Sequence, residues 1–388
     1  MNRRKIFCGA FGLILLCFLT AGLPPAQTPP GKTATSIAAD ASAVEPPVED
    51  IAKFISGIPC SVEPWKTLQN STEWTAFAAG LEKSWGELEE KRLEPMRTWA
   101  RAELAEANAA TKILFYPFGG PDFMTAYVFF PEAETYVLLG LEFVGQLPEF
   151  KATESSRAAS YLSNLQAAFS DFFQKSYFIT HNMDVALAGD KVDGILPILC
   201  FFLKRTGKTI VEVRRCAFPE GMGLVEYDFG LRRRSRRPYG IKIAFSSSGS
   251  NKLRTLYYFS CDLADLSFGT NSAFYAYLNG LPFETTFLKS ASYLPHYKEF
   301  SNIRSMILDK SRFILEDDTG IPFRYFPNKT WDVQLYGEYI KPVTDFAGVE
   351  QLDLKAAYAD PGRVKTLPFH VGYHWGTNKD SILSIRKK

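Results

Sequence analysis

The chain is poor in the residues and motifs that mark the common kinds of active site. Its 388 residues include only 4 histidines and 6 cysteines, and no two cysteines have the Cys-x-x-Cys spacing of zinc sites and redox dithiols. No Gly-x-Ser-x-Gly segment marks a hydrolase nucleophile. The formal net charge is only +2, which argues against a dedicated nucleic-acid-binding protein. We therefore expect neither a zinc enzyme, nor a serine hydrolase, nor a nucleic-acid binder.

The four histidines form no metal motif either. His370 and His374 are four residues apart, but Gly372 lies between them and argues against a metal-binding helix. His181 and His296 are distant from this pair in the chain. The sequence therefore predicts packed or partly exposed histidines, no metal site and no bound cofactor.

Apolar and aromatic residues, by contrast, are abundant. Hydrophobic residues make up 46% of the chain and aromatic residues 14%, with 32 Phe and 18 Tyr, while charged residues make up 22%. This composition excludes a chain that is disordered throughout. It predicts a large core with aromatic-rich strands.

The first 26 residues have the pattern of a secretory signal peptide. Arg3, Arg4 and Lys5 form a basic start, residues 6–23 are apolar and uncharged, and a segment rich in proline and small residues follows. The alternative is an uncleaved membrane anchor, because the run approaches the ~18 residues needed to span a bilayer. Both alternatives place the remainder outside the cytoplasm, so we expect a periplasmic or secreted protein.

Beyond this segment we expect a linker and one domain. Residues 27–50 are rich in proline and alanine, which predicts a disordered linker, and residues 51–388 form a single exported domain. Export permits disulfides among the four remaining cysteines, but the apolar neighbours of Cys200 and Cys261 favour small buried thiols. Residues 71–110 predict a helical lead-in whose tryptophans pack in the core rather than bind a ligand.

Residues 112–145 contain the clearest architecture in the chain. A strand over 113–118 is followed by the turn Gly119-Gly120-Pro121-Asp122, a helix over 123–130, and a strand over 135–141 that ends at Glu142. This is the outline of a β-α-β unit with a glycine turn at its first crossover. Continuous apolar runs in both strands predict a parallel sheet that is covered on both faces.

The rest of the chain continues the alternation of strands and helices. We expect helices over 155–173, 195–205 and 272–278, a helical stretch over 291–316, strands over 209–213 and 283–290, and a hairpin of 241–245 with 253–260. The predicted fold class is α/β: a Rossmann-like, mostly parallel sheet of six or seven strands with flanking helices and an N-terminal helical cap.

The β-α-β stretch resembles the first half of a class I methyltransferase or another Rossmann-like domain. The resemblance implies that Gly119 and Gly120 let the backbone approach a cofactor, and that Glu142 accepts hydrogen bonds from a ribose. Two features depart from the family pattern: the glycines are adjacent instead of spaced, and Pro121 removes an amide. The phrases YPFGGPDF, KSASYL and DDTGIPFRYF also resemble an uncharacterised bacterial exported family, which implies no activity.

Ligands of open α/β sheets bind at the carboxyl ends of the strands. The candidate ligand-binding residues at this edge are Tyr116, Gly119, Gly120, Asp122, Glu142 and Asp262, possible partners of which are Lys289 and His181. This hypothesis requires that Asp122 and Glu142 lie on the same side of the sheet.

Two charged clusters have competing interpretations. The run Arg232, Arg233, Arg234, Arg236 and Arg237 either contacts an anionic envelope component, such as lipopolysaccharide or anionic lipid, or is a solvated loop. The acids Glu316, Asp317 and Asp318 either bind calcium or mark the end of a helix before a turn at Gly320.

Taken together, these patterns predict an exported bacterial protein of unknown function, whose α/β domain is a non-catalytic binding or structural domain. The nucleotide cofactors of Rossmann-like enzymes are cytoplasmic, which weighs against the alternative of an enzyme with a degenerate, methyltransferase-like site at Gly119-Gly120. The identity of any ligand and the oligomeric state do not follow from the sequence.

Overall fold

The computed structural model describes residues 48–175, 187, 191–219, 222–227, 238–247, 249–250, 252–269, 273–374, 376 and 379–388. These residues belong to one compact unit that comprises residues 45–388. The segment 1–26, nearly all of the linker 27–50, His181 and the arginines of 232–237 lie outside the described residues. The signal-peptide and arginine-run predictions therefore stay predictions.

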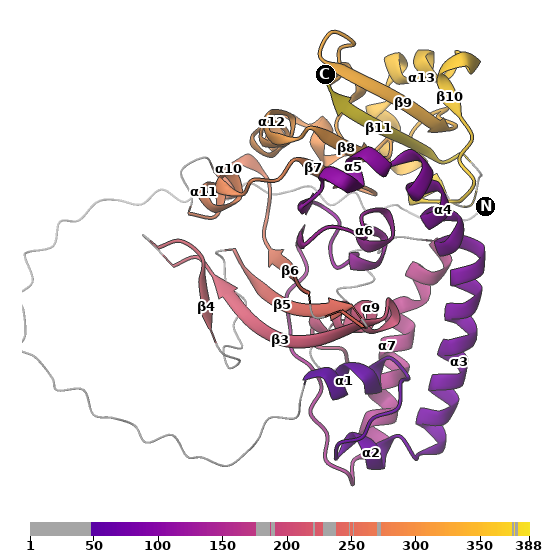
Figure 1. Ribbon diagram of the computed structural model, residues 1–388, viewed down its shortest axis with the longest axis vertical. Helices are drawn as coiled ribbons and strands as arrows, with labels where there is room; N and C mark the ends of the chain where they lie inside the picture. Colours follow the sequence, from indigo (N-terminus) through magenta and orange to yellow (C-terminus); the bar gives the residue numbers. More distant parts are fainter. Residues whose placement is uncertain are drawn as a thin grey trace, which may run out of the picture. The chain divides into compact units, whose positions relative to one another are not determined.

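Eleven strands of the described chain form one sheet, in the order β10-β9-β11-β8-β7-β1-β2-β6-β5-β3-β4 (Figure 1). The strands are β1 Ile113–Tyr116, β2 Thr135–Gly140, β3 Lys208–Ala217, β4 Val225–Tyr227, β5 Tyr239–Ser247, β6 Leu253–Ser260, β7 Thr285–Leu288, β8 Phe313–Glu316, β9 Trp331–Gly337, β10 Val364–Lys365 and β11 Ser381–Lys387. The predicted number of six or seven strands is too low: the predicted strands do not include β4, β9, β10 or β11, and β8 lies in the stretch predicted to be helical.

The centre of the sheet is parallel, and antiparallel pairs flank it on both sides, while the edge strand β10 pairs parallel with β9. Strands β6, β2, β1, β7 and β8 run parallel to one another. On one side β5, β3 and β4 follow β6 in antiparallel pairs, and on the other side β11 pairs antiparallel with both β8 and β9. The α/β class is thus confirmed and so is the β5–β6 hairpin, but the sheet is mixed rather than mostly parallel.

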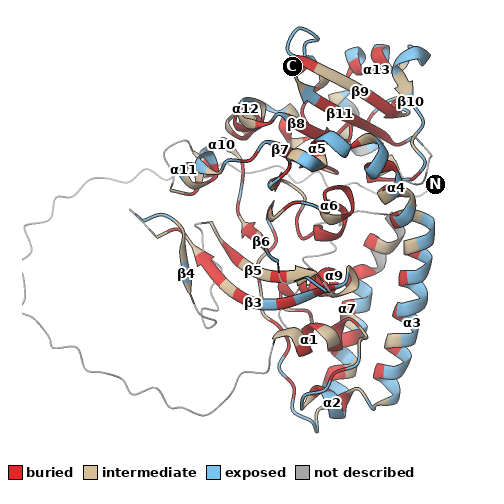
Figure 2. Ribbon diagram, in the orientation of Figure 1, coloured by how far each residue is buried: buried red, intermediate tan, exposed pale blue. Residues whose placement is uncertain are grey.

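Helices cover both faces of the sheet (Figures 1 and 2). In β1, Leu114 and Tyr116 belong to one core cluster and Phe115 to the other, as the alternation of side chains along a strand requires. All three side chains are fully buried. Burial on both faces explains why the central strands are continuous apolar runs in the sequence.

The two faces have different helices. The core cluster of the first face includes residues of α1 Val48–Ile55, α2 Trp65–Leu68, α3 Thr72–Leu88, α4 Glu94–Glu103, α5 Ala105–Ala110, α6 Phe123–Phe129, α7 Ser155–Lys175 and α9 Leu196–Arg205. The cluster of the second face includes residues of α10 Asp265–Phe268, α11 Ala273–Gly280, α12 Ser301–Lys310 and α13 Leu352–Tyr358.

The helical lead-in begins and packs as predicted. Ser71 caps α3, because its side-chain oxygen accepts a hydrogen bond from the Trp74 amide at 3.2 Å. A π-helical turn, Glu89–Leu93, joins α3 to α4. Trp74, Trp85 and Trp99 are at most 8% exposed, which confirms that they are core residues.

The helix predicted over 291–316 is wrong at both ends. Short 3-10 turns precede α12, and β8 follows it as a buried strand between β7 and β11. The apolar residues at 313–315 are compatible with either a helix face or a buried strand. They form a strand because they pair with both β7 and β11.

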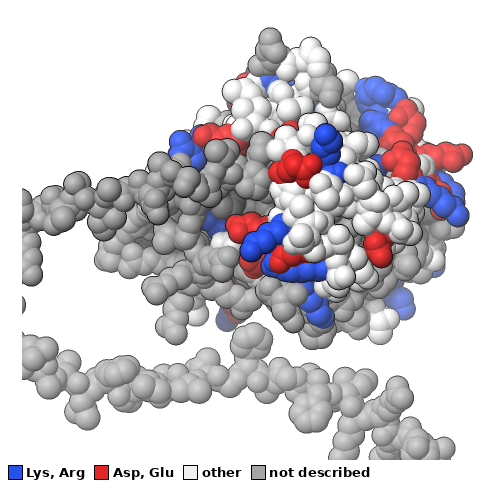
Figure 3. All heavy atoms as spheres, turned by 90° about the horizontal axis from the view of Figure 1, so that it is seen from below, with Lys and Arg blue, Asp and Glu red and all other residues white. Residues whose placement is uncertain are grey.

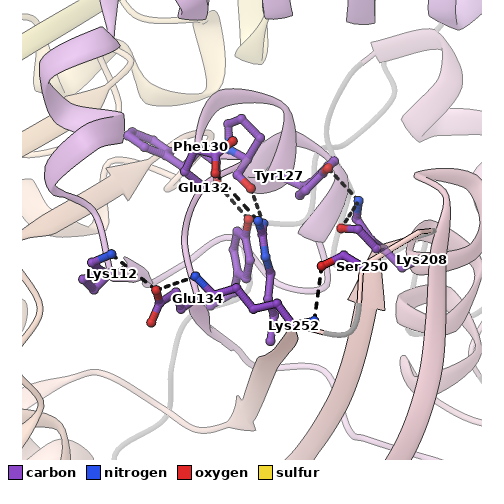
Figure 4. Close-up of polar contacts among 12 residues, drawn as sticks. Lys112, Tyr127, Phe130, Glu132, Glu134, Lys208, Ser250 and Lys252 are labelled. Carbon is purple, nitrogen blue, oxygen red and sulfur yellow. Dashed lines mark hydrogen bonds and ion pairs between the residues drawn. The ribbon is translucent and has the colours of Figure 1, made fainter.

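Exposed ion pairs lie where the central parallel strands begin (Figure 4). Lys112 and Lys252 both extend to Glu134, with Nζ–Oε1 distances of 3.3 and 2.7 Å. On the face drawn in Figure 3, basic and acidic side chains lie next to one another instead of forming separate patches. Such surface pairs contribute about 0–1 kcal/mol each. Among the described residues, no helix is long and apolar enough to cross a membrane.

The four cysteines of the described chain, Cys60, Cys200, Cys216 and Cys261, are free thiols, and all four are buried. This agrees with the buried-thiol interpretation of Cys200 and Cys261. Burial raises the pKa of the Cys60 and Cys216 thiols to about 12, so little thiolate exists at neutral pH.

We expect these four thiols to resist alkylation in the native protein. In a variant with Cys8 and Cys17 replaced by serine, maleimide should add to none of the four under native conditions and to all four in urea, as counted by mass spectrometry. Rapid native labelling of any of them, or a failure to label in urea without reductant, would contradict the free, buried thiols.

Candidate functional site

The order in which the chain adds strands to the sheet reverses at β1. The chain passes from β1 through α6 to β2 on one side, whereas β7 pairs with β1 on the other side. Such a point is where open α/β sheets bind ligands, beyond the carboxyl ends of the strands. A pocket of about 630 Å³ lies at this edge, within the ~300–1,000 Å³ of small-molecule sites.

The pocket brings together every candidate residue that the sequence placed at this edge. Its lining includes Tyr116, Gly119, Gly120, Asp122, Glu142 and Asp262, together with Lys289. Asp122 and Glu142 thus lie in one pocket, as the hypothesis requires. The geometry permits a site, and ligand binding by these residues stays a prediction.

The turn after β1 is tightly packed. Phe118 adopts a left-handed backbone with φ 64°, and Gly120 follows with φ 57°. A Cβ at Gly119 would lie 2.3 Å from Cζ of Tyr116, so only glycine fits over this ring. The Gly120 amide donates to the Leu139 carbonyl at 3.2 Å, and it is therefore already used within the protein.

Asp122 forms a buried ion pair with Lys289 at a distance of 2.6 Å, and both side chains are at most 3% exposed. Asp122 also caps α6, because its Oδ1 accepts from the Thr125 amide at 3.0 Å, and its Oδ2 accepts from the Tyr116 hydroxyl at 3.1 Å. Burial, together with the charge of Asp122, raises the pKa of Tyr116 well above its ordinary value. Tyr116 therefore stays a neutral donor to this carboxylate.

Glu142, two residues beyond the end of β2, has its carboxylate against the glycine turn. A Cβ at Gly140 would lie 2.5 Å from Glu142 Oε2 and 2.8 Å from the Gly120 Cα. The Tyr258 hydroxyl lies 2.8 Å from the Glu142 carbonyl and 3.2 Å from Oε2. The absence of side chains at Gly120 and Gly140 thus leaves room for the Glu142 carboxylate, which is buried and lines the pocket.

Asp262, in contrast, organises its own loop. Its Oδ1 accepts from the Ala264 amide at 2.9 Å, and its Oδ2 accepts from the Ser267 hydroxyl at 2.7 Å. Asp262 is exposed to solvent and shapes the start of α10. It lies at the pocket, but its carboxylate is engaged by the protein.

Beyond Lys289, the sequence did not identify the loop after β7 as part of the site. Ser290, Ser292 and Tyr293 all have left-handed backbone conformations, with φ between 51° and 54°. Ser290, Ala291 and Ser292 line the pocket. A left-handed backbone at non-glycine residues leaves no signal in a single sequence, so only the tertiary structure shows it.

Asp317 and Asp318, which follow β8, hold this loop in place, and Glu316 at the end of β8 holds the next turn. Asp317 Oδ2 accepts from the Ser290 amide at 2.8 Å, Asp318 accepts from the Tyr293 hydroxyl, and Glu316 accepts from the Ile321 amide at 2.8 Å. All three acids are at most 5% exposed. Their oxygens serve the protein itself, and they lie at the end of a strand, not of a helix.

Burial raises the pKa of all three acids. For Asp317, burial and then the charge of Asp318 raise the pKa to about 7, against the effect of the Thr319 and Ser290 hydrogen bonds. Burial raises the pKa of Asp318 to about 6, while the Tyr293 hydrogen bond acts against it. The loop after β7 thus depends on carboxyl groups that titrate near neutral pH.

The histidines make separate contacts. His370 Nδ1 lies 2.7 Å from Asp380 Oδ2, and His374 Nε2 lies 4.0 Å from Asp318 Oδ2. Burial lowers the pKa of His296 to about 4. Within the described ranges, no three His, Cys, Asp or Glu side chains are grouped so that they could hold a metal ion.

The chain was also compared with known proteins. No protein-family model matches it, and neither does any curated protein. The resemblances to Rossmann-like domains and to an exported family therefore stay proposals.

Proposed function

We propose that this is an exported α/β domain of Rossmann-like type that binds a nucleoside, or a similar ligand with neighbouring hydroxyl groups, without transforming it. The observation that carries the proposal is the Glu142 carboxylate, buried against the Gly120 turn inside the pocket. A carboxylate at the end of the second strand is where Rossmann-like domains accept hydrogen bonds from a ribose.

The order of the central strands supports a Rossmann-like assignment. Across the sheet, the five parallel strands lie in the order β6, β2, β1, β7, β8. If they are numbered 1 to 5 along the chain, this order reads 3-2-1-4-5. This corresponds to the 3-2-1-4-5 part of the dinucleotide-binding order. The insertion of β3, β4 and β5 before β6 and the antiparallel β11 distinguish this sheet from the plain arrangement.

The electrostatics of the pocket argue for a ligand without phosphate. Phosphates bind at helix N-termini, but at α6 the Asp122 carboxylate already occupies this position, and Pro121 offers no amide. Among the described lining residues, three are acidic and one, Lys289, is basic and paired with Asp122. This charge balance favours a neutral or positively charged ligand over an anionic one.

The same charge balance favours one second candidate. S-adenosylmethionine combines a ribose with a positively charged sulfonium, and Glu142 and the excess acidic charge would suit both groups. A methyltransferase-like enzyme is therefore the alternative to simple binding. S-adenosylmethionine would supply the methyl group, and the residues of this chain would bind and orient it.

Calorimetric titration with adenosine and with adenosine 5′-monophosphate tests the proposal. We expect adenosine to bind and the phosphate to bind at least about tenfold more weakly, because Lys289 already pairs with Asp122 and the phosphate meets the remaining acidic charge of Glu142 and Asp262. Glu142→Gln should reduce adenosine affinity about tenfold or more, since a hydrogen bond to a charged acceptor contributes roughly 1.5–3 kcal/mol.

The matched control is Glu149→Gln, which removes the same charge from an exposed side chain seven residues later. This variant should bind adenosine like the unaltered protein. Equal binding by adenosine and its phosphate, or undiminished binding by Glu142→Gln, would reject the proposal. Methyl transfer from S-adenosylmethionine to any acceptor would replace simple binding with the enzymatic alternative.

A further inference from the structure

The pocket has two chemically different halves, which lie over different strands. The half beyond β2 and β6 contains Glu142 and Asp262, and it is the half in which the proposed nucleoside would bind. The other half is formed by loops on the opposite side of β1 and by segments that flank β9 and β11. Its lining combines the loop residues Ser290 and Ser292 with apolar and aromatic side chains: Phe118, Leu294, Phe300, Val343, Phe346 and Tyr373.

Two aromatic rings of this second half are held nearly parallel. The rings of Phe346 and Tyr373 have centroids 5.9 Å apart and planes 12° apart. The Tyr373 hydroxyl donates to the Ser290 carbonyl at 2.9 Å and lies 3.0 Å from the Ser292 hydroxyl. Tyr373 is thus fixed at its polar end, and its ring stacks on that of Phe346.

A second pair of rings comes from other elements. Phe118 follows β1 and Phe300 precedes α12, and their centroids are 5.9 Å apart with planes 69° apart. Phe118 is placed there by a left-handed backbone, which costs about 1–3 kcal/mol in a residue other than glycine. The four such residues of the described chain, Phe118, Ser290, Ser292 and Tyr293, all lie in the two loops that shape this half.

We propose that the half of the pocket lined by Phe118, Phe300, Phe346 and Tyr373 is a second subsite that binds an uncharged aromatic ring beside the nucleoside. Rings with edge-to-face and stacked partners gain about 0.5–1.5 kcal/mol beyond the burial of their area. The faces and edges of these rings can interact with the ring of an aromatic guest, an interaction that an aliphatic guest of the same size cannot make. The subsite deepens the proposed function, on which it rests for the occupant of the other half.

Titration with p-cresol and with its saturated analogue 4-methylcyclohexanol tests the subsite, with binding detected by saturation-transfer NMR. We expect p-cresol to bind several times more tightly than the saturated analogue, and to bind also in the presence of adenosine. Phe346→Leu, which keeps an apolar side chain but removes the ring, should weaken p-cresol binding about fivefold and leave adenosine binding unchanged. Phe300 lies in another segment, so Phe300→Leu can replace the first variant if that variant does not fold. It should likewise weaken p-cresol binding and leave adenosine binding unchanged.

Tyr275→Leu is the matched control, because this ring contacts Phe268 and does not line the pocket. The subsite is refuted if the two probes bind equally, if p-cresol displaces adenosine, or if neither ring variant weakens p-cresol binding. Glu142→Gln separates the two proposals, since it should weaken adenosine binding only. Binding of p-cresol that depends on Phe346 without any binding of adenosine would retain the subsite and reject the nucleoside.

Discussion

Replacement of Lys289 by methionine is expected to lower the free energy of unfolding by about 3–5 kcal/mol. The ammonium lies 2.6 Å from the Asp122 carboxylate, and both side chains are at most 3% exposed. Methionine retains the packing of the chain but leaves this carboxylate buried without its positive partner. Tyr116 and Thr125 continue to donate hydrogen bonds to Asp122, which places the expected loss toward the lower end of the range.

Urea denaturation at neutral pH measures this loss, and Lys112→Met is the matched control. Lys112 makes an ion pair with Glu134 at 3.3 Å (Figure 4). Unlike Lys289, its side chain is 70% exposed. The same substitution there should cost at most about 1 kcal/mol. Similar losses in the two variants would show that burial does not strengthen the Lys289–Asp122 pair. The double variant Asp122→Asn/Lys289→Met should recover part of the stability, because it removes the buried charge.

The second large effect is on the pH dependence of stability. Burial raises the pKa of Asp317 to about 7 and that of Asp318 to about 6, whereas both titrate near 4 in an unfolded chain. Between about pH 4 and pH 7 the folded state therefore binds more protons at these two groups than the unfolded state does. These two groups therefore stabilise the fold fully below about pH 4, and this contribution is lost as the pH rises through about 6 to 7. We expect a loss on the order of 3 kcal/mol between pH 5 and pH 8.

Other groups titrate in the same range with the opposite sign. His296 has its pKa lowered to about 4 by burial, so the unfolded state binds its proton first and stability rises with pH there. The comparison of the protein with Asp317→Asn cancels such contributions. The stability advantage of the unaltered protein over this variant should be largest near pH 5 and should shrink by pH 8. A difference that is constant with pH, or that grows toward pH 8, would contradict a raised Asp317 pKa.

The β-α-β stretch shows how much of the site the sequence could predict. The pattern indicated both strands, the glycine turn and the helix, because each depends on contacts within a few residues: Asp122 caps α6, and burial on two faces makes β1 and β2 continuously apolar. The parallel pairing of β1 and β2 then brings Gly120 and Glu142 together. Candidate residues at this edge could therefore be named without coordinates.

The remainder of the pocket depends on contacts between distant segments. Lys289 is 167 positions from Asp122, and Tyr373 reaches the Ser290 carbonyl across 83 positions. The extra strands β9, β10 and β11 are short or ambiguous in pattern, so their pairing decides their structure. No local pattern specifies such pairings, and none specifies a left-handed backbone at Phe118 or Ser290.

The sequence alone thus determined the α/β class, the buried tryptophans and thiols, and the β-α-β unit with its acid at the end of β2, because these depend on the periodicity and burial preferences of neighbouring residues. Only the tertiary structure decided that the sheet is mixed, that Asp122 is neutralised by Lys289, and that aromatic rings from four separate segments line one pocket. The physical reason is that strand order and side-chain convergence are set by contacts far apart in the chain, whose free energy arises only when the whole core has assembled.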